Sequence, residues 1–435
     1  MSIGMTHSVA LQGLAGNLIE IEVDIADGIP GFTLLGLPDA ALSESRDRVR
    51  AALSNCQEPW PNKKVTVSLS PAWLPKSGSG FDLSIAIALL IAQHLLPQEP
   101  FHDTIILGEL SLDGKVRAIQ GVLPALISAF QQGIRRAIIP FANRAEAKLL
   151  PDMAIIEVCS LHDVTQWARE GVLPTFAELD LEISLPGEEL DFVDVAGQSK
   201  ARRAAEIAAS GGHHLLLIGP PGAGKTMIAS RIPTILPALT TEEALEVTAV
   251  HSISGGFSSR SPMSRQAPIV APHHTASRVA IVGGGSYIIK PGACSLAHHG
   301  VLFIDEAPEC TIGVLDSLRQ PLESGTITIT RSVGNITFPA RFLLVLAANP
   351  CPCGKYIGKG RGCTCTSLQV RRYLGKLSGP LMDRIDMRVI VEPVSRVEMA
   401  DTAPAESSSD IRRRVLTARA AAAERFSQFP WQLNS

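Results

Sequence analysis

Eight consecutive residues constrain the fold of this chain more than any others: the segment Gly219–Thr226, which reads Gly-Pro-Pro-Gly-Ala-Gly-Lys-Thr. An apolar run, His214–Ile218, precedes it and a helix-like run follows it, which is the context that a phosphate-binding loop requires. Glycines let the backbone wrap phosphates, the helix N-terminus presents free N–H groups, Lys225 supplies a positive charge, and Thr226 offers a hydroxyl to Mg²⁺. The alternative is an ordinary glycine- and proline-rich turn. The segment predicts an ATP site formed by Gly219, Pro220, Pro221, Gly222, Ala223, Gly224, Lys225 and Thr226.

A second apolar run, Val301–Ile304, ends in two carboxylates, Asp305 and Glu306. Ligands of parallel sheets bind outside the carboxyl ends of the strands, so the pattern predicts that both carboxylates lie beside the phosphate-binding loop. We expect Asp305 to hold the Mg²⁺ shell and Glu306 to activate the attacking water. Asn349 ends the apolar run Phe342–Ala348 and could orient that water; the alternative is a cap at the end of the strand.

Strand-like and helix-like segments alternate along the whole chain, which predicts an α/β fold in two domains. In residues 191–394 the strands are apolar throughout, as in a parallel sheet covered on both faces. Residues 1–177 form a separate α/β domain, and the acidic stretch 178–190 is a linker. Helices are expected at Asp39–Cys56, Phe81–Leu96, Ser199–Ser210 and Ser409–Phe426, and strands at Lys64–Leu69, Thr104–Leu107, Arg136–Ile139 and Ile155–Val158; Val9–Leu37 is apolar but broken by glycine and proline.

Composition indicates a globular protein, with 46% hydrophobic and 19% charged residues. The first ten residues lack the basic head and apolar core of a secretory signal. The longest apolar stretch, Leu83–Leu96, is interrupted by polar residues and is too short to span a bilayer. We therefore expect a cytoplasmic protein with no membrane partner. Eight cysteines fit that compartment as free thiols or metal ligands.

Four of these cysteines lie in two close pairs inside the stretch 351–365. Four thiolates can complete a tetrahedral Zn²⁺ site, so a possible zinc site is predicted, although Cys-x-Cys differs from the usual Cys-x-x-Cys spacing. The alternative is free thiols in a basic loop. The candidate ligands are Cys351, Cys353, Cys363 and Cys365.

Charge is segregated along the second half of the chain. No Asp or Glu occurs from Val247 through Ile304 or from Ser324 through Met382, whereas both tracts carry Lys and Arg. This pattern favours surfaces that face a polyanion such as DNA, and part of the charge could instead surround ATP. The basic residues are Arg260, Arg265, Arg278, Lys290, Arg331, Arg341, Lys355, Lys359, Arg361, Arg371, Arg372 and Lys376, and Phe257 or Tyr287 could stack on bases.

Two histidine pairs, His273-His274 and His298-His299, raise the question of a second metal site. Adjacent side chains in a strand or loop are expected to point apart, so neither pair is predicted to chelate. A structural or phosphate-facing role is expected instead.

Five segments together resemble the magnesium-chelatase-like AAA+ family: Gly219–Thr226, Val301–Glu306, Ala271–Ser277, Gly283–Tyr287 and Leu296–Gly300. The Cys-Pro-Cys-Gly segment and the first domain are similar to the branch of this family that acts in competence. The resemblance covers essentially the whole chain. It implies a homo-hexameric ring that translocates on single-stranded, forked or junction DNA and drives branch migration in recombination during natural transformation.

The same resemblance implies roles for further segments. Arg384 matches the arginine finger that reaches a neighbour's ATP, and Asp383 and Asp386 could hold its orientation. Residues between Thr240 and Ser295 match hairpin insertions that point into the ring pore. Residues 395–435 correspond to the start of a helical lid, which the resemblance implies is incomplete.

Residues 1–177 are similar to the proteolytic domain of Lon, which has the fold of the second domain of ribosomal protein S5. Pro75–Gly80 resembles the segment that holds the nucleophilic serine of Lon, and the alignment places Gly80 at that serine and Leu123 at the lysine. The domain is therefore expected to be a scaffold without the catalytic dyad. Besides a DNA motor, two functions stay open: a chelatase-type subunit that remodels a protein partner, and an ATP-dependent protease.

Overall fold

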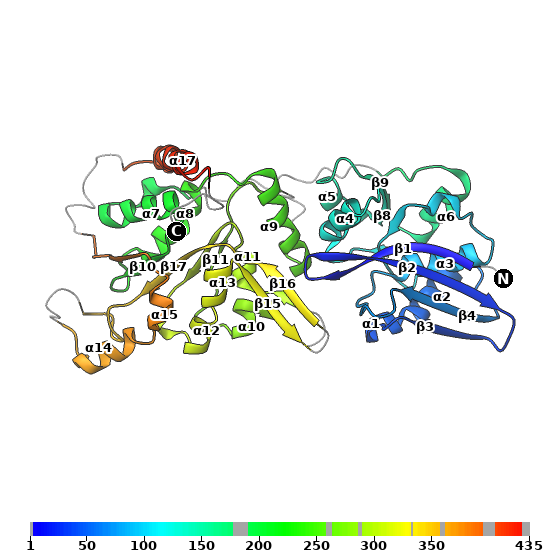
Figure 1. Cartoon of the computed structure of the whole chain (residues 1–435), viewed down its shortest axis with the longest axis horizontal. Coiled ribbons are helices and arrows are strands. Elements are labelled where there is room, and N and C mark those ends of the chain that lie inside the picture. The colour runs from blue at the N-terminus through cyan, green and yellow to red at the C-terminus, as the bar shows by residue number, and fades with distance from the viewer. Residues whose placement is uncertain are drawn as a thin grey trace. The chain divides into compact units, whose positions relative to one another are not determined.

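The computed structural model describes residues 3–176, 190–257, 263–285, 289–331, 334–356, 362–394 and 405–428. These residues fall into two compact units, and Figure 1 labels most of their helices and many of their strands. Unit 1 comprises Met1–Ile183, Thr248–Met263 and Arg331–Ile336, and unit 2 comprises Ser184–Val247, Ser264–Thr330 and Thr337–Ser435. The predicted linker 178–190 lies, except for Leu190, outside the described residues.

A seven-stranded mixed sheet is the frame of unit 1, with the order β3-β4-β2-β1-β5-β8-β9. β1 (Ile3–Gln12) and β2 (Ala15–Ala26) form a long antiparallel hairpin. On the other side of β1 the pairing becomes parallel, through β5 to β8 and β9. The other strands are β3 (Gly31–Leu35), β4 (Lys64–Ser70), β5 (Thr104–Ile106), β8 (Arg136–Pro140) and β9 (Ala154–Val158), with a small ladder of β6 (Glu109–Leu110) and β7 (Val116–Arg117).

The helices of unit 1 pack on this sheet according to their apolar residues. α3 (Asp82–Ala92) is apolar on nearly all sides, and every one of its residues is buried. The helix expected at Asp39–Cys56 is divided at Glu44 into α1 (Ala40–Ser43) and α2 (Ser45–Asn55). The remaining helices are α4 (Val122–Gln131), α5 (Arg144–Ala147) and α6 (Leu161–Glu170).

Unit 2 contains a five-stranded sheet in which every pair is parallel, with the order β11-β14-β17-β10-β18. Alternate residues of β10, β14 and β17 enter two separate apolar cores: Phe303 lies in one and Leu302 in the other. The predicted parallel sheet, covered on both faces, is thus confirmed. Its strands are β10 (Leu215–Ile218), β11 (Ile269–Val270), β14 (Val301–Ile304), β17 (Leu343–Ala348) and β18 (Met387–Ile390).

Helices and two small ladders complete unit 2, although α9 and the β15–β16 ladder also contribute residues to unit 1. The ladders are β12 (Gly283–Gly284) with β13 (Lys290–Pro291), and β15 (Thr326–Arg331) with β16 (Gly334–Pro339). The helices are α7 (Ser199–Gly211), α8 (Lys225–Ile235), α9 (Thr241–Ser254), α10 (Arg278–Val282), α11 (Ala293–Leu296), α12 (Ile312–Asp316), α13 (Arg319–Ser324), α14 (Ser367–Leu374), α15 (Gly379–Met382) and α17 (Ser408–Arg425), with 3₁₀ turns η3 (Phe192–Asp194) and η4 (Ala307–Glu309). Across the described residues, no helix combines the length and the apolar character needed to cross a membrane.

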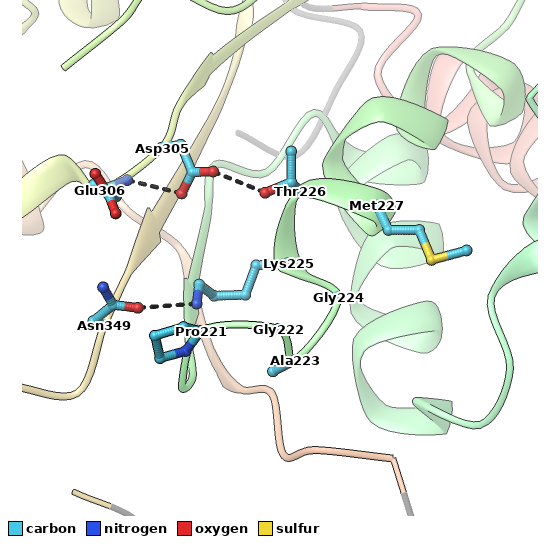
Figure 2. Close-up of a pocket in the computed structure, with 10 residues that line it drawn as sticks. All are labelled: Pro221, Gly222, Ala223, Gly224, Lys225, Thr226, Met227, Asp305, Glu306 and Asn349. Carbon is cyan, nitrogen blue, oxygen red and sulfur yellow. Dashed lines mark hydrogen bonds between the residues drawn. The ribbon is translucent and has the colours of Figure 1, made fainter. Parts of the chain in front are cut away.

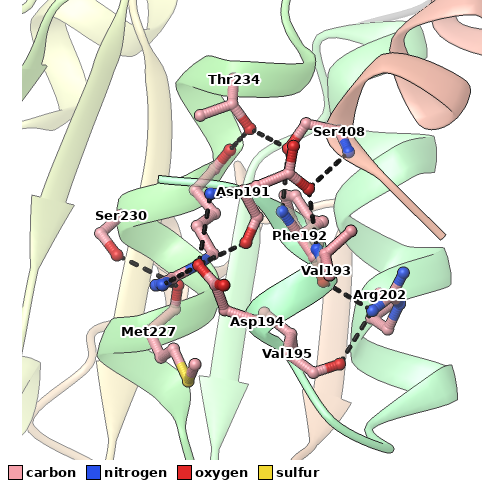
Figure 3. Close-up of polar contacts among 11 residues, drawn as sticks. Asp191, Phe192, Val193, Asp194, Val195, Arg202, Met227, Ser230, Thr234 and Ser408 are labelled. Atoms are coloured by element: carbon pink, nitrogen blue, oxygen red, sulfur yellow. Dashed lines mark hydrogen bonds and ion pairs between the residues drawn. The ribbon is translucent and has the colours of Figure 1, made fainter. Parts of the chain in front are cut away.

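The first residues of unit 2 tie α17 to α8 (Figure 3). The backbone N–H of Ser408 donates to Asp191 at 2.8 Å, and the N–H of Phe192 donates to the Ser408 hydroxyl at 2.9 Å. That hydroxyl also lies 2.7 Å from the hydroxyl of Thr234 in α8. Arg231, one turn earlier in α8, donates to the carbonyl of Asp191 at 2.7 Å. The helix that starts at Ser408 is therefore fixed to the helix that follows the phosphate-binding loop.

Candidate nucleotide site

The phosphate-binding loop connects β10 to α8, and glycine is required where the loop passes other backbone. A Cβ on Gly219 would lie 2.2 Å from the carbonyl oxygen of Val391, so no side chain fits there. Gly224, directly before α8, has φ of 87°, in the left-handed region that glycine tolerates best. The loop therefore turns tightly and leaves the first N–H groups of α8 open toward a ligand.

Lys225 is held inside the loop by three acceptors. Its Nζ donates to the carbonyls of Gly219 at 2.7 Å and Pro220 at 2.9 Å, and to Oδ1 of Asn349 at 3.2 Å. Burial lowers the pKa of Lys225, and the nearby charges of Asp305 and Glu306 oppose that shift. Figure 2 shows the ammonium group between the loop and Asn349. Asn349 thus reaches the loop from the end of β17, as the sequence predicts.

Asp305 is fixed by both of its carboxylate oxygens. Oδ2 accepts from the hydroxyl of Thr226 at 2.8 Å, and Oδ1 accepts from the N–H of Glu306 at 2.8 Å. Glu306 has φ of 49°, so the backbone turns at this residue and sends the two side chains in different directions (Figure 2). A hydroxyl and a carboxylate oxygen are ligands that suit Mg²⁺.

These residues line one pocket of about 420 Å³ at the carboxyl ends of β10, β14 and β17. The pocket wall contains most of the predicted ATP-site residues, whereas Gly219 and Pro220 lie at the base of the loop. Met227 is a wall residue that the sequence did not single out. The lining residues are Pro221, Gly222, Ala223, Gly224, Lys225, Thr226, Met227, Asp305, Glu306 and Asn349.

His274 is a site residue that sequence reasoning missed. Its Nδ1 lies 3.1 Å from Oε2 of Glu306, the predicted base. His274 follows β11, the neighbour of β14, so the two side chains meet because their strands pair. The only signal in the sequence is the pair His273-His274 itself, because β11 is too short to be recognised from its pattern.

The prediction that adjacent histidines point apart is wrong for both pairs. The ring centroids are 4.1 Å apart in His273-His274 and 3.9 Å apart in His298-His299. The backbone of His299 has φ of 55°, which turns its ring to the side of its neighbour. Nε2 of His298 and Nε2 of His299 each lie 3.0 Å from the same oxygen of Glu246, in α9.

The cluster of Glu246, His298 and His299 is nevertheless a hydrogen-bonded anchor. Nδ1 of His298 accepts the N–H of Arg341 at 3.1 Å, so the ring proton is on Nε2 and points at Glu246. Burial lowers the pKa of His298 to about 4, which keeps this ring neutral. A ring that accepts at one nitrogen and donates at the other has no lone pair left for a metal.

Arg384 lies outside the pocket of its own chain. Its guanidinium pairs with the carboxylate of Glu323, at the end of α13. The expected partner Asp386 instead accepts the N–H of His214 at 2.7 Å, so the prediction that Asp386 orients Arg384 is wrong. The finger role of Arg384 stays a prediction, because it requires a second subunit.

The four predicted zinc ligands meet at one point. The Sγ atoms of Cys351 and Cys353 are 3.3 Å apart, those of Cys351 and Cys363 are 3.7 Å apart, and those of Cys353 and Cys363 are 3.6 Å apart. Cys365 joins them, and all four Sγ atoms lie within 4.8 Å of one another.

The two positions of unit 1 that resemble the dyad of Lon hold Gly80 and Leu123 and therefore no serine–lysine pair. Gly80 has no side chain, and Leu123 is buried, with its N–H donating to Glu146 at 3.0 Å. The hydroxyl of Ser79 donates to Glu109. Nζ of the buried Lys76 donates to the carbonyl oxygens of Leu69, at 2.9 Å, and Pro71. Both groups are thus committed to other partners.

Most basic side chains of the two acid-free tracts are exposed where the structure describes them, whereas Lys376 is half-buried and lies 3.9 Å from Glu309. Arg260, Tyr287, Lys359 and Arg361 lie outside the described residues. The exposed basic side chains are Arg265, Arg278, Lys290, Arg341, Lys355, Arg371 and Arg372.

Two family models match the chain. The model of magnesium chelatase subunit ChlI matches residues 191–399, and a second model, subunit ChlI of Mg-chelatase, matches residues 21–143. Among known proteins, an uncharacterized protein of Mycobacterium tuberculosis is 48% identical over 435 residues, which is 100% of this chain and 86% of the relative. Competence protein ComM of Haemophilus influenzae is 43% identical over 440 residues, again 100% of this chain and 86% of the relative. Lon protease of Solibacter usitatus is 27% identical over 196 residues, or 43% of this chain and 24% of that protein.

Proposed function

This chain belongs to the magnesium-chelatase-like AAA+ family, with competence protein ComM among the relatives that match it from end to end, and on this premise we propose that it is an ATP-driven DNA motor. In this proposal the chain assembles into a homo-hexameric ring in the cytoplasm. The ring hydrolyses ATP, translocates on single-stranded, forked or junction DNA, and drives branch migration in recombination during natural transformation.

The observation that carries ATP hydrolysis is the convergence of three strand ends on one pocket. Lys225 is held with its charge inside the loop, where it can bind the β- and γ-phosphates. Two carboxylates line that pocket: Asp305 is fixed by the hydroxyl of Thr226 and the N–H of Glu306, whereas the side chain of Glu306 points away from them, with Oε2 3.1 Å from Nδ1 of His274. Glu306 is therefore the group that can take a proton from water, with Asn349 placed to orient the water.

Thr226 and Asp305 are the residues that would hold Mg²⁺. Their oxygens are 2.8 Å apart at the N-terminus of α8, and hydroxyl and carboxylate oxygens are the donors this ion prefers. When bound, the ion neutralises charge on the phosphates during transfer. The hydroxyl of Thr226 and the carboxylate of Asp305 are already close together, so both oxygens could bind the same ion with little movement.

DNA as the substrate is supported by the exposed basic side chains and by the relative's name. The two acid-free tracts place Lys and Arg side chains on the surface, and no Asp or Glu of the same tract can neutralise their charge. This favours a phosphate backbone as a partner. Competence is the uptake of DNA, and ComM carries that word in its name. The similarity to Lon argues less for a protease, because the resemblance places Gly80 and Leu123 at the positions of the dyad.

The test measures the rate of ATP hydrolysis with no DNA, with single-stranded DNA and with a four-way junction. We expect DNA to stimulate the rate several-fold, with the junction at least as effective as the single strand. Glu306→Gln, measured in parallel, reports any contaminating ATPase. Equal rates in all three conditions would contradict the DNA motor and favour the chelatase-type remodeller, and ATP-dependent degradation of casein would favour the protease.

A further inference from the structure

The sulfur–sulfur distances among Cys351, Cys353 and Cys363 match those of a metal site, and Sγ of Cys365 lies within 4.8 Å of all three. A tetrahedral zinc ion with Zn–S bonds of about 2.3 Å separates its sulfur atoms by about 3.8 Å. The observed separations of 3.3, 3.7 and 3.6 Å lie close to that value. A disulfide needs its sulfur atoms about 2.05 Å apart, so none of these pairs forms one.

The backbone around the cysteines is also arranged for sulfur. The N–H of Cys365 donates to Sγ of Cys363 at 3.4 Å, and the N–H groups of Lys355 and Thr364 point at Sγ of Cys353. Hydrogen bonds of this kind orient metal ligands and compensate their charge. We propose that Cys351, Cys353, Cys363 and Cys365 bind one zinc ion, and that this zinc site supports the wall of the nucleotide pocket.

The second part of the proposal rests on how the cysteine turn contacts the phosphate-binding loop. The N–H of Gly354 donates to the carbonyl of Cys351 at 2.9 Å, which closes a tight turn. A Cβ on Gly354 would lie 2.7 Å from Cδ of Pro221, so this turn packs directly on the loop. At its other end the turn is only two residues from Asn349, which binds Lys225.

The zinc ion therefore joins the two ends of a long excursion between β17 and α14. Structural zinc supplies much of the folding energy of such segments, so loss of the ion would loosen the turn at Cys351–Gly354. Asn349 and Pro221 would then lose the backing that positions them. Nucleotide affinity, and not only the rate of hydrolysis, depends on zinc in this proposal, which rests on the proposed ATP site.

The metal part is tested on the full chain, purified without chelators or a metal-affinity tag. Elemental analysis should find about one zinc per chain, as expected for a closed four-thiolate site. A mercurial that titrates thiols should release the zinc as the cluster reacts. The double variant Cys353→Ser, Cys363→Ser should lose the zinc, whereas Cys56→Ser, Cys159→Ser, which alters two cysteines of unit 1, should keep it. Zinc-free wild-type protein would overturn the metal site.

The coupling is tested with two glycines of the same excursion. Gly354 and Gly362 have φ of 73° and 89°, so alanine strains the backbone at both. The new Cβ meets Pro221 at Gly354, whereas no atom of the described residues lies within 4 Å of a Cβ on Gly362. Gly354→Ala should keep its zinc and bind a fluorescent ATP analogue about tenfold more weakly, or about 1.4 kcal/mol, with Gly362→Ala near wild type.

The outcomes separate the two proposals. Equal nucleotide affinity in wild type, Gly354→Ala and the zinc-free cysteine variant would overturn the coupling. A wild-type protein that contains zinc but binds no nucleotide would overturn the proposed function and leave the metal site standing.

Discussion

Glu306 is placed between two neighbours that determine what its carboxylate can do. Its own N–H is committed to Asp305, and its left-handed backbone turns the side chain away from that residue. The carboxylate then meets His274 across the β11–β14 pair, with 3.1 Å between Oε2 and Nδ1. Asp305 therefore lies on the side of the pocket where Mg²⁺ would bind, and the carboxylate of Glu306 lies on the side where water would react.

Glu306→Gln is expected to keep ATP bound and to lose turnover. The amide preserves the size of the side chain but cannot accept a proton, and general-base catalysis contributes roughly 10²- to 10⁴-fold to such rates. Binding of a fluorescent ATP analogue and release of phosphate are measured on the same preparation. Hydrolysis at the wild-type rate would remove Glu306 from its assigned role.

Lys225→Ala serves as the matched control for that experiment. It removes the charge that the loop carbonyls and Asn349 hold in place, so ATP binding itself should fail. The two variants then differ in the step that they block, and general damage to the fold would not produce that difference.

At the residue scale, the sequence predicts the position of a side chain when that position is fixed by the local strand, loop or helix. Lys225, Thr226 and Asp305 lie where the sequence puts them, because a strand–loop–helix unit and a strand end position them locally. His274 could not be predicted, since its contact with Glu306 depends on which strands pair. The predicted partner of Arg384 was wrong for a similar reason, because its actual partner, Glu323, belongs to α13 and is far away in the sequence.

Among the elements, the connection from α11 to β14 is fixed by imidazoles and not by apolar packing alone. His298 accepts the N–H of Arg341 and donates to Glu246 of α9. Burial lowers the pKa of His298 to about 4, from 6.5. Despite its partial burial, Glu246 has its pKa lowered by the hydrogen bonds from His298 and His299.

Both shifts predict that unit 2 loses stability as the pH falls. An unfolded His298 binds a proton near pH 6.5, whereas the folded one does so only near pH 4, so acid favours the unfolded state within that window. By pH 5 the loss from His298 is about 2 kcal/mol, or roughly a thirtyfold lower protection factor in hydrogen exchange. The measurement compares peptides that cover β14 at pH 7.5 and pH 5, corrected for intrinsic exchange.

His298→Gln should flatten this dependence on pH, because glutamine can accept from Arg341 and donate to Glu246 without titrating. His162→Gln, at an exposed position of α6, is the matched control and should behave as wild type. If His298→Gln shows the full loss of protection between pH 7.5 and pH 5, another group titrates and the assignment to His298 fails.

The sequence identifies well the strands that are buried on both faces of the sheet and a helix whose apolar residues are regularly spaced. β14 has the predicted bounds, and β10, β17 and α7 differ from theirs by one residue. β18 was not predicted, since it is a short edge strand that gains its conformation from pairing with β10. The hairpin of β1 and β2 was also missed, because glycines and prolines nearby read as breaks, and α1 and α2 were merged because Glu44 leaves the apolar spacing intact.

For the whole molecule, the proposed ring predicts an active site shared by two chains. Arg384 contacts Glu323 and does not line the pocket of its own chain. A guanidinium supplied by a neighbour can contribute on the order of 10³-fold or more to phosphoryl transfer. Hydrolysis would then depend on assembly, since Lys225 and Arg384 of one site come from different chains.

Mixing two inactive variants tests this arrangement. Lys225→Ala and Arg384→Ala should each be inactive alone, and their mixture should regain part of the ATPase rate. In a mixed ring some sites combine an intact Lys225 with an intact Arg384 from the next chain. Normal hydrolysis by Arg384→Ala, or no recovery in rings shown by mass spectrometry to be mixed, would rule out the finger.

The two ends of the parallel sheet differ in chemistry, and this difference has a genetic consequence. The carboxyl end carries Lys225, Asp305 and Asn349, whereas the amino end is closed by the imidazoles of His214 and His298, which accept backbone N–H groups. Substitutions at the carboxyl end of the sheet should give a protein that accumulates normally in the cell but is inactive. Substitutions at the amino end should instead lower the amount of protein, because partly unfolded chains are degraded. Defective alleles would therefore sort into two groups by abundance on a blot, before any activity is measured.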